Sequence, residues 1–193
     1  MSYHIYTTKG IILKTMNFGE ADQVLYILTE NFGLIFASVK SSRLLLSKLR
    51  NFLEEYCVLN VSLIKGRNTW RITNVDGKEF SFSEYPKESR RILAQVSLIL
   101  LKMITGESPH REIFNIVNGG FNVLKKVKGE NDLQSVETLL VLRIMKELGY
   151  VVYQQNIDKF FGVDWGEEII KDTFEKRVTL VGLINKAIME SHL

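Results

Sequence analysis

Two different spacings of apolar residues divide the chain near residue 85. Before that point, short apolar runs separated by glycine-bearing turns are typical of β-strands. In the run TWRITNV, the apolar residues Trp70, Ile72 and Val75 alternate with polar ones. The pattern predicts five strands, at residues 10–16, 23–30, 34–40, 54–64 and 69–75. Five short strands with tight turns predict a small closed barrel, and the five-stranded OB-fold is one such barrel.

From residue 86 onward the apolar residues recur every three or four positions, which is the spacing of one helical face. Pro86 and Pro109 both suit the first turn of a helix. The pattern predicts helices at 87–105, 111–127 and 133–148, with one or two more between 164 and 190. We therefore predict a two-part α+β protein, with an OB-fold domain at residues 1–82 and a C-terminal helical bundle at residues 83–193.

Positive charge is concentrated in the first part of the chain. Residues 1–83 carry 10 basic and 7 acidic side chains, whereas residues 84–193 carry 15 of each. No Asp or Glu lies between Glu30 and Glu54. Seven basic residues lie between positions 40 and 71: Lys40, Arg43, Lys48, Arg50, Lys65, Arg67 and Arg71. Because they come from separate elements that a small barrel can bring together, they are candidates for a phosphate-binding face.

A charged stretch is usually plain solvated surface, and composition alone leaves that interpretation open. Aromatic residues also lie among the basic ones, at Phe36, Phe52 and Trp70. A basic groove with exposed rings is what sequence-tolerant binding of single strands requires. Phe36 and Phe52, however, are expected to belong to the barrel core. The residues by themselves therefore leave both nucleic-acid binding and an ordinary charged surface open.

Catalytic and metal-binding motifs are missing from the sequence. The histidines His4, His110 and His192 lack metal-ligand spacing, and no nucleotide-binding or hydrolase motif occurs. One acidic cluster could hold a divalent cation, although a solvated helix face is the favoured interpretation: Asp164, Glu167, Glu168 and Asp172. We therefore expect no enzyme, no metal and no cofactor.

Three smaller features bear on location and packing. Cys57 is the single cysteine and lies in an apolar run, so we expect a buried thiol in a reducing compartment. The N-terminus lacks a signal-peptide pattern, and the longest apolar stretch, 96–104, is too short to cross a bilayer. A cytoplasmic protein with no membrane partner is expected. For Gly119 and Gly120, close helix packing is favoured over contact with a partner.

Within the first 75 residues, an ordered series of short motifs resembles the bacterial recombination mediator family RecO. Residues 8–14, TKGIILK, are similar to the family's opening strand, and residues 18–22, FGEAD, to its G-E-x-D turn. Residues 29–35, TENFGLI, resemble its T-x-x-x-G-L-I segment. VKSSR at 39–43 stands where the family has a basic K-G-x-R-type segment, and SKL at 47–49 resembles its S-R/K-L.

The helical part is similar to the family in layout, and Leu139, Leu140 and Gly149 resemble its L-L-x-x-x-G region. Two positions depart from the family pattern. Ser41 replaces the usual glycine, which makes a positive φ less accessible there. Many members carry a four-cysteine zinc module after the L-G segment, but residues 150–161, YVVYQQNIDKFF, contain no cysteine. We therefore predict no zinc.

The resemblance implies a non-enzymatic protein that binds single- and double-stranded DNA through the seven basic residues and anneals complementary strands. It further implies work with RecR to load RecA onto strands coated by single-strand-binding protein. The acidic, apolar C-terminal tail of that protein would dock on the helical domain, where Arg143 and Lys146 are candidate contacts. The implied location is the nucleoid-associated cytoplasm. Two alternatives stay open: a protein-interaction adaptor, and an OB-fold RNA-binding protein.

Overall fold

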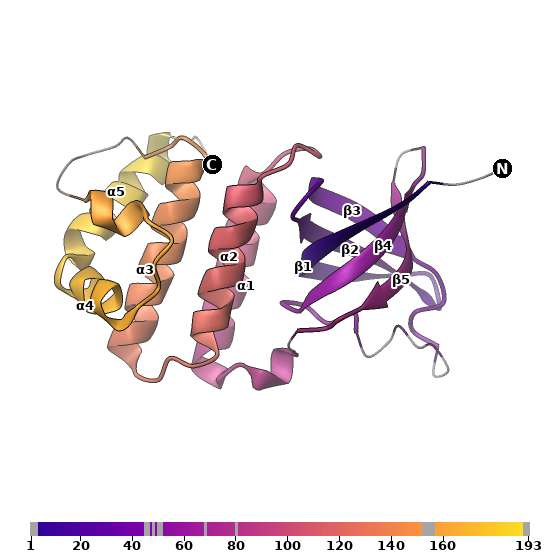
Figure 1. Ribbon diagram of the computed structural model, residues 1–193, viewed down its shortest axis with the longest axis horizontal. Helices are drawn as coiled ribbons and strands as arrows, with labels where there is room; N and C mark the ends of the chain where they lie inside the picture. Colours follow the sequence, from indigo (N-terminus) through magenta and orange to yellow (C-terminus); the bar gives the residue numbers. More distant parts are fainter. Residues whose placement is uncertain are drawn as a thin grey trace. The chain divides into compact units, whose positions relative to one another are not determined.

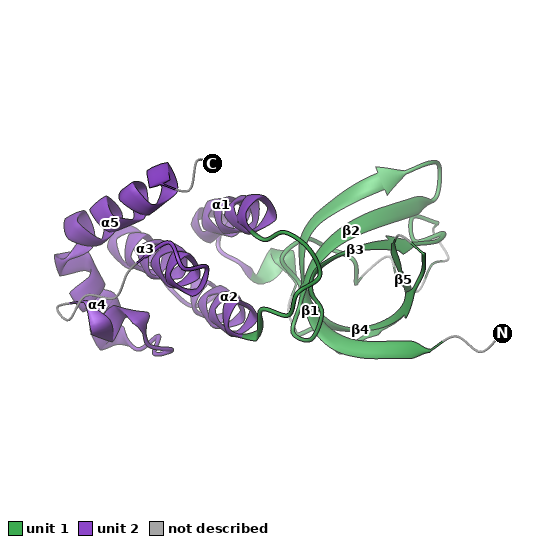
Figure 2. Ribbon diagram, turned by 90° about the horizontal axis from the view of Figure 1, so that it is seen from above, with its two compact units in different colours: residues 1–84, 104–111 green, residues 85–103, 112–193 purple. Residues whose placement is uncertain are grey.

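The computed structural model describes residues 4–44, 47, 49, 52–67, 69–79, 81–151 and 157–190. The chain forms two compact units (Figure 2). The first combines residues 1–84 with the separate segment 104–111, and the second combines residues 85–103 with 112–193. We call them the barrel unit and the helical unit. The predicted domains, 1–82 and 83–193, assumed a single boundary and did not include the return of segment 104–111 to the barrel unit.

The barrel unit is a closed five-stranded barrel (Figure 1). Its strands are β1 (Ile5–Phe18), β2 (Asp22–Thr29), β3 (Gly33–Val39), β4 (Val58–Lys65) and β5 (Trp70–Asp76). They close in the order β1-β2-β3-β5-β4. All neighbours are antiparallel except β3 and β5, which are parallel and pair Ala37 with Trp70 and Ser38 with Arg71. This is the predicted OB-fold.

The first strand is longer than predicted because it belongs to two sheet faces at once. Its first half pairs with β4 and its second half with β2. The register shifts between Ile12 and Lys14, which is how one strand turns the corner of a small barrel. The inside is filled by side chains with almost no exposure, among them Ile12, Leu25, Ile27, Ile35, Leu59 and Val61. Large apolar residues on the outer face of the barrel are therefore not required by this core.

Segment 104–111 packs against the turn between β2 and β3. At Gly33, which has φ of +69°, a Cβ atom would lie 2.0 Å from the carbonyl oxygen of Ser108. Glu107 accepts a hydrogen bond of 3.0 Å from the indole of Trp70, and Arg111 forms a 3.1 Å ion pair with Glu30. A stretch that sequence pattern identifies only as a break between helices is thus a structural part of the barrel unit.

The helical unit contains α1 (Lys87–Met103), α2 (Arg111–Leu124), α3 (Glu130–Glu147), α4 (Glu167–Glu175) and α5 (Arg177–Glu190). Among the described residues, short 3-10 turns occur at Phe82–Glu84 in the barrel unit and Asp158–Phe161 in the helical unit. Helix α3 is central: it contacts α1, α4 and α5 and is buried over most of its length. A Cβ at Gly120 would meet the side chain of Leu140 at 2.4 Å, and one at Gly119 would meet Trp165 at 2.6 Å. Close packing therefore explains the glycine pair.

The helix boundaries differ from the prediction mainly at α3. Residues 130–132, predicted as a loop, form its first turn, where the carboxylates of Glu130 and Asp132 interact favourably with the positive end of the helix dipole. Among the described residues, no helix has both the length and the apolar composition needed to span a membrane.

Candidate nucleic-acid interface

The basic segment after β3 is fixed to the turn between β1 and β2. One carboxylate oxygen of Asp22 accepts a 2.9 Å hydrogen bond from the backbone N–H of Ser41, and the other accepts a 2.6 Å bond from the ammonium group of Lys40. The bond from Lys40, followed by the bond from the Ser41 backbone, lowers the pKa of Asp22. The carboxylate is therefore ionised at neutral pH and holds this segment in place.

Further bonds extend this anchoring to the next two residues. The backbone N–H of Arg43 donates to the carbonyl of Ala21 at 3.0 Å, and its guanidinium donates to the carbonyl of Gly19 at 3.2 Å. The hydroxyl of Ser42 donates to Gln23 at 2.9 Å. The FGEAD turn and the VKSSR segment are thus two halves of one contact, which explains why the two motifs occur together.

Ser41 has φ of +54°, in the left-handed region that favours glycine. The side chain there does not prevent this conformation, because the bond to Asp22 holds the backbone in it. The positive φ turns the chain so that Lys40 and Arg43 both face the turn between β1 and β2.

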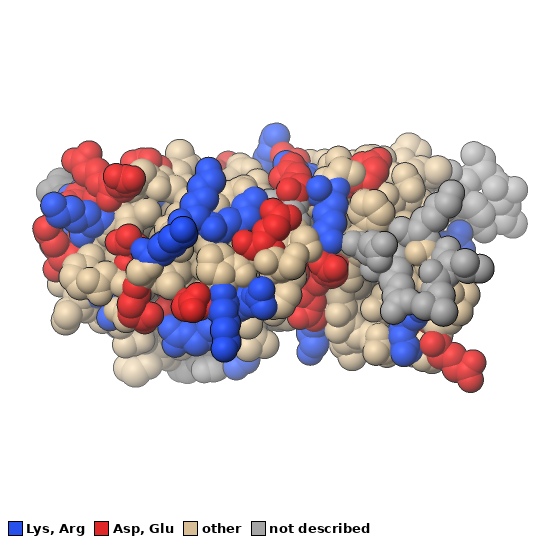
Figure 3. Space-filling model, turned by 90° about the horizontal axis from the view of Figure 1, so that it is seen from below, with Lys and Arg blue, Asp and Glu red and all other residues tan. Residues whose placement is uncertain are grey.

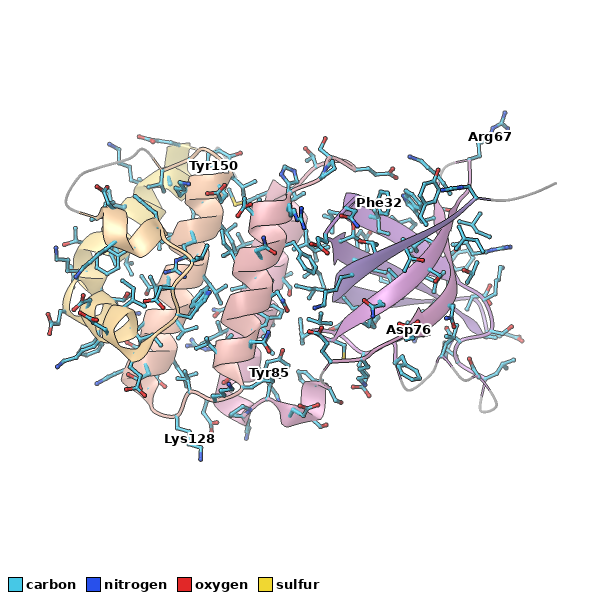
Figure 4. All side chains as sticks on the ribbon, viewed as in Figure 1. Phe32, Arg67, Asp76, Tyr85, Lys128 and Tyr150 are labelled. Carbon is cyan, nitrogen blue, oxygen red and sulfur yellow. The ribbon has the colours of Figure 1, made fainter. Side chains whose placement is uncertain are left out.

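The remaining candidates lie on or near β4 and β5. Lys65 ends β4, pairs with Glu107 at 2.8 Å and lies 5.1 Å from the centre of the Trp70 ring. Arg67 lies in the turn between these strands and extends away from the barrel (Figure 4). Arg71 lies on β5 in register with Ser38, two residues before Lys40. Lys48 and Arg50 lie outside the described residues.

Positive and negative charges lie side by side on the surface where these cations are paired. On the face in Figure 3, Lys and Arg side chains lie interspersed with Asp and Glu. Lys40 pairs with Asp22 and Lys65 with Glu107, and the bond from Lys65 lowers the pKa of Glu107. Among the described residues, Arg43, Arg67 and Arg71 form no ion pair with a carboxylate. These arginines are available to an anionic ligand without breaking an existing pair.

The aromatic residues separate into buried and exposed ones. Trp70 is 2% exposed and its N–H is bound to Glu107, so it belongs to the core. Phe52 packs against the same core, as predicted. For Phe36 the core prediction is wrong: its side chain is 39% exposed on the outer face of β3, edge-to-face with Tyr26 at 5.1 Å. Tyr26 was not identified from the sequence.

Comparison with known proteins finds a family model and relatives that this chain resembles. Residues 1–80 match the family model for the recombination protein O N-terminal domain. The chain is 27% identical over 147 residues to a protein of Rubrobacter xylanophilus named DNA repair protein RecO, covering 76% of this chain and 58% of that protein. It is 32% identical over 115 residues to the protein of that name from Gloeothece citriformis, covering 58% of this chain and 40% of that protein.

The N-terminal 80 residues of this chain are thus similar to the N-terminal domain of the RecO family. Dehalococcoides mccartyi has a DNA repair protein RecO that is 43% identical over 70 residues, 36% of this chain and 28% of that protein. The chain spans between two fifths and three fifths of the length of the first four relatives.

The two candidates for contact with a partner's tail lie in different environments. Arg143 is 1% exposed, donates to the carbonyls of Phe160 at 2.9 Å and Asp164 at 2.6 Å, and lies 4.4 Å from the ring centre of Trp165. Burial lowers its pKa to about 10, which still leaves it charged at neutral pH. Lys146 is partly exposed and pairs with Glu147. The guanidinium of Arg143 is therefore bound within its own unit.

Two of the four residues in the predicted acidic cluster, Asp164 and Asp172, have separate partners. Asp164 accepts a hydrogen bond from the backbone N–H of Gly166 at 2.9 Å, and Asp172 pairs with Lys159. Within the part of the chain that the structure describes, no three His, Cys, Asp or Glu side chains gather as metal ligands. Cys57 is buried, and burial raises the pKa of its thiol to about 11. That thiol is protonated at neutral pH and has the packing role that was predicted.

Proposed function

We propose that this chain is a non-enzymatic DNA-binding recombination mediator of the RecO type. The observation that carries the proposal is a RecO-family OB barrel whose basic segment is fixed by Asp22 and the carbonyls of the turn between β1 and β2. Phosphate groups are the same in every DNA sequence. Contacts from Lys and Arg are therefore expected to give sequence-independent and strongly salt-dependent binding.

The proposed phosphate contacts are those of the basic face: Lys40, Arg43, Lys48, Arg50, Lys65, Arg67 and Arg71. In the described part of this face, Arg43, Arg67 and Arg71 would bind phosphates first, because Lys40 and Lys65 must exchange a carboxylate for a phosphate. Annealing would follow from holding two DNA backbones near one positive surface, which offsets their mutual repulsion. Nothing in this process requires hydrolysis.

A salt titration tests the proposal. We expect the chain to bind a fluorescein-labelled single strand, with affinity falling steeply from 50 to 200 mM NaCl. In Lys40→Glu/Arg43→Glu, affinity is expected to fall about tenfold or more, and the slope of log K against log salt to fall by about 0.7 for each lost phosphate contact. Fluorescence anisotropy measures both quantities.

The matched control is Lys87→Glu/Lys186→Glu, which makes the same change in charge at exposed positions of α1 and α5. It is expected to bind close to the wild type. Negligible binding at low salt, or equal losses in both double variants, would contradict the basic-face proposal. Equal affinity for RNA of the same sequence would favour the RNA-binding alternative. Absence of nucleic-acid binding would favour the adaptor.

The finer family activities are part of the same proposal. They are annealing, action with RecR in loading RecA onto strands coated by single-strand-binding protein, and a location in the nucleoid-associated cytoplasm. The support is the shared N-terminal domain and the name, DNA repair protein RecO, that the relatives carry.

For the tail of single-strand-binding protein, we propose a pocket of the helical unit in place of direct contact with the buried Arg143, whose stacking partner Trp165 lines that pocket. A hollow of about 600 Å³ has an apolar floor that includes Trp165, and three lysines edge it. These are Lys126, Lys128 and Lys171, and Lys128 projects away from the helices (Figure 4). An acidic, apolar tail requires an apolar hollow with cations at its rim. Asp132 and Glu167 also line the hollow, so the lysines must outweigh two carboxylates.

Charge reversal at the rim tests this placement. Lys126→Glu/Lys128→Glu is expected to weaken binding of a labelled peptide with several aspartates and a C-terminal phenylalanine by about tenfold, because exposed ion pairs contribute about 0.2–1 kcal/mol each and reversal adds repulsion. The single variant Lys146→Glu tests the competing candidate on α3. A loss confined to Lys146→Glu would place the tail at α3 instead.

A further inference from the structure

A row of exposed and partly exposed aromatic, apolar and cationic residues crosses the outer side of strands β1, β2, β3 and β5. In the register of the sheet, Lys14 is opposite Tyr26, and Tyr26 is opposite Phe36. One step along, Met16 is opposite Val24, Val24 is opposite Ser38, and Ser38 is in register with Arg71. We call this surface the outer face, and its members are Lys14, Met16, Val24, Tyr26, Phe36 and Arg71.

The side chains of the outer face point away from the core because strand residues alternate between two faces. The neighbours of Tyr26 along β2, Leu25 and Ile27, are fully buried, and so is Ala37 beside Phe36. Phe36 is 39% exposed and Met16 is 45% exposed. Tyr26 is partly exposed, and leaving it, Phe36 and Met16 in contact with water costs free energy that the filled core does not require. These residues therefore point to a ligand that covers them.

The charges at the edges of the outer face identify the kind of ligand. Lys14 lies at the β1 edge and Arg71 at the β5 edge, about three strand spacings or ~14 Å apart. Among the described residues, neither cation pairs with a carboxylate. The nearby Asp22 is already paired with Lys40. Flat apolar rings between two free cations suit a ligand with π-faces and a phosphate backbone.

We infer that Tyr26 and Phe36 form a stacking platform for unpaired bases of a single-stranded nucleic acid, with Lys14 and Arg71 contacting its phosphates. The inference rests on the proposed DNA-binding function. It adds a means of discrimination, because paired bases inside a duplex do not offer their faces to a protein ring. The basic segment would then bind both forms of DNA through phosphates, while the outer face would bind only the single strand.

The edge-to-face contact between Tyr26 and Phe36 supports this role. Their ring centres are 5.1 Å apart with the planes at 65°, so neither ring is covered by the flat face of the other. The outer face also continues into the basic segment, since Arg71 is in register with Ser38 and Lys40 follows on the same strand end. A strand bound along Lys40 and Arg71 would therefore pass beside the two rings.

The test compares the wild type with Tyr26→Leu/Phe36→Leu in the full chain. Leucine keeps an apolar side chain on the strand but removes the π-face. An unchanged melting temperature would show that the variant still folds. We expect binding of a labelled 20-nucleotide poly-dT strand to weaken about tenfold or more. Binding of a 20-base-pair duplex and its salt slope are expected to stay the same.

A second probe separates base stacking from backbone contact. A strand with the same phosphates but with bases replaced by abasic sites is expected to bind the wild type as weakly as the leucine variant binds poly-dT. The leucine variant should not distinguish the two strands. The inference would be overturned if the leucine variant lost affinity equally for the single strand and the duplex. It would also be overturned if the affinity for poly-dT did not change, and that result would favour a protein partner on the outer face. If the wild type binds neither DNA, the proposed function fails as well, so the two failures are distinguishable.

Discussion

Replacing Arg143 by methionine is expected to destabilise the helical unit by about 3 kcal/mol. The reason is that a buried carbonyl left without its donor costs about 1–3 kcal/mol and a bond from a charged donor contributes about 1.5–3 kcal/mol. Phe160, whose carbonyl accepts from Arg143, is fully buried. Methionine fills much of the volume but donates nothing to that oxygen. Urea unfolding followed by circular dichroism measures the change.

Two further variants show which property of Arg143 matters. Arg143→Lys keeps the charge but cannot make the two directed bonds while stacking on Trp165, so it is expected to lose most of the same stability. Lys146→Met, three residues along α3 and partly exposed, is expected to change stability by less than about 0.5 kcal/mol. If Arg143→Met and Lys146→Met unfold at the same urea concentration, Arg143 is not a structural residue. It then becomes a candidate contact for a partner again.

The sequence could have indicated that Arg143 is buried. Residues Leu139 to Met145 of α3 are all buried, so this part of the helix has no polar face on which an arginine could reach water. A helix that is apolar on every side lies inside a bundle, and a cation within it needs its own partners. The prediction considered the charge of Arg143 and the helix that carries it. Its partners, at 17 and 21 residues along the chain, are not visible in a local pattern.

The order of the elements was predictable, whereas the faces of the strands were not. Alternation and helical spacing located five strands and the helices, because each pattern is local. Phe36 was assigned to the core because LIFASVK is apolar at almost every position, so the run by itself does not show which of its residues face inward. The pairing of Phe36 with Tyr26 on β2 decides which residues face outward, and a shift of the register by one residue would exchange the two faces.

The candidate site was predictable in charge but not in geometry. Counting charges located the basic residues on one part of the chain. It could not show that Lys40 pairs with an acid 18 residues away, or Lys65 with one 42 residues away in segment 104–111. Such pairs depend on tertiary contacts. They change the expected ranking of the cations, since, within the described residues, Arg43, Arg67 and Arg71 have no carboxylate partner to give up before they bind phosphate.

Gly33→Ala is expected to destabilise the barrel unit by more than about 3 kcal/mol. The backbone strain of an alanine at φ of +69° accounts for about 1–2 kcal/mol. The rest comes from the Cβ, which would lie 2.0 Å from the backbone oxygen of Ser108 and cannot avoid it by rotation. Segment 104–111 must move, and its ion pair between Arg111 and Glu30 would be lost.

Gly106→Ala is the matched control for this change. Gly106 lies in the same segment with φ of +81°, but a Cβ there meets nothing within 4 Å, so it is expected to cost only the strain, about 1–2 kcal/mol. The difference between the two variants in urea unfolding measures the contact of the segment with the turn. Equal losses would mean that the segment shifts freely. A larger loss in Gly33→Ala would explain the TENFGLI motif, in which the hydroxyl of Thr29 donates to the carbonyl of Gly33 at 2.8 Å and closes the turn that receives segment 104–111.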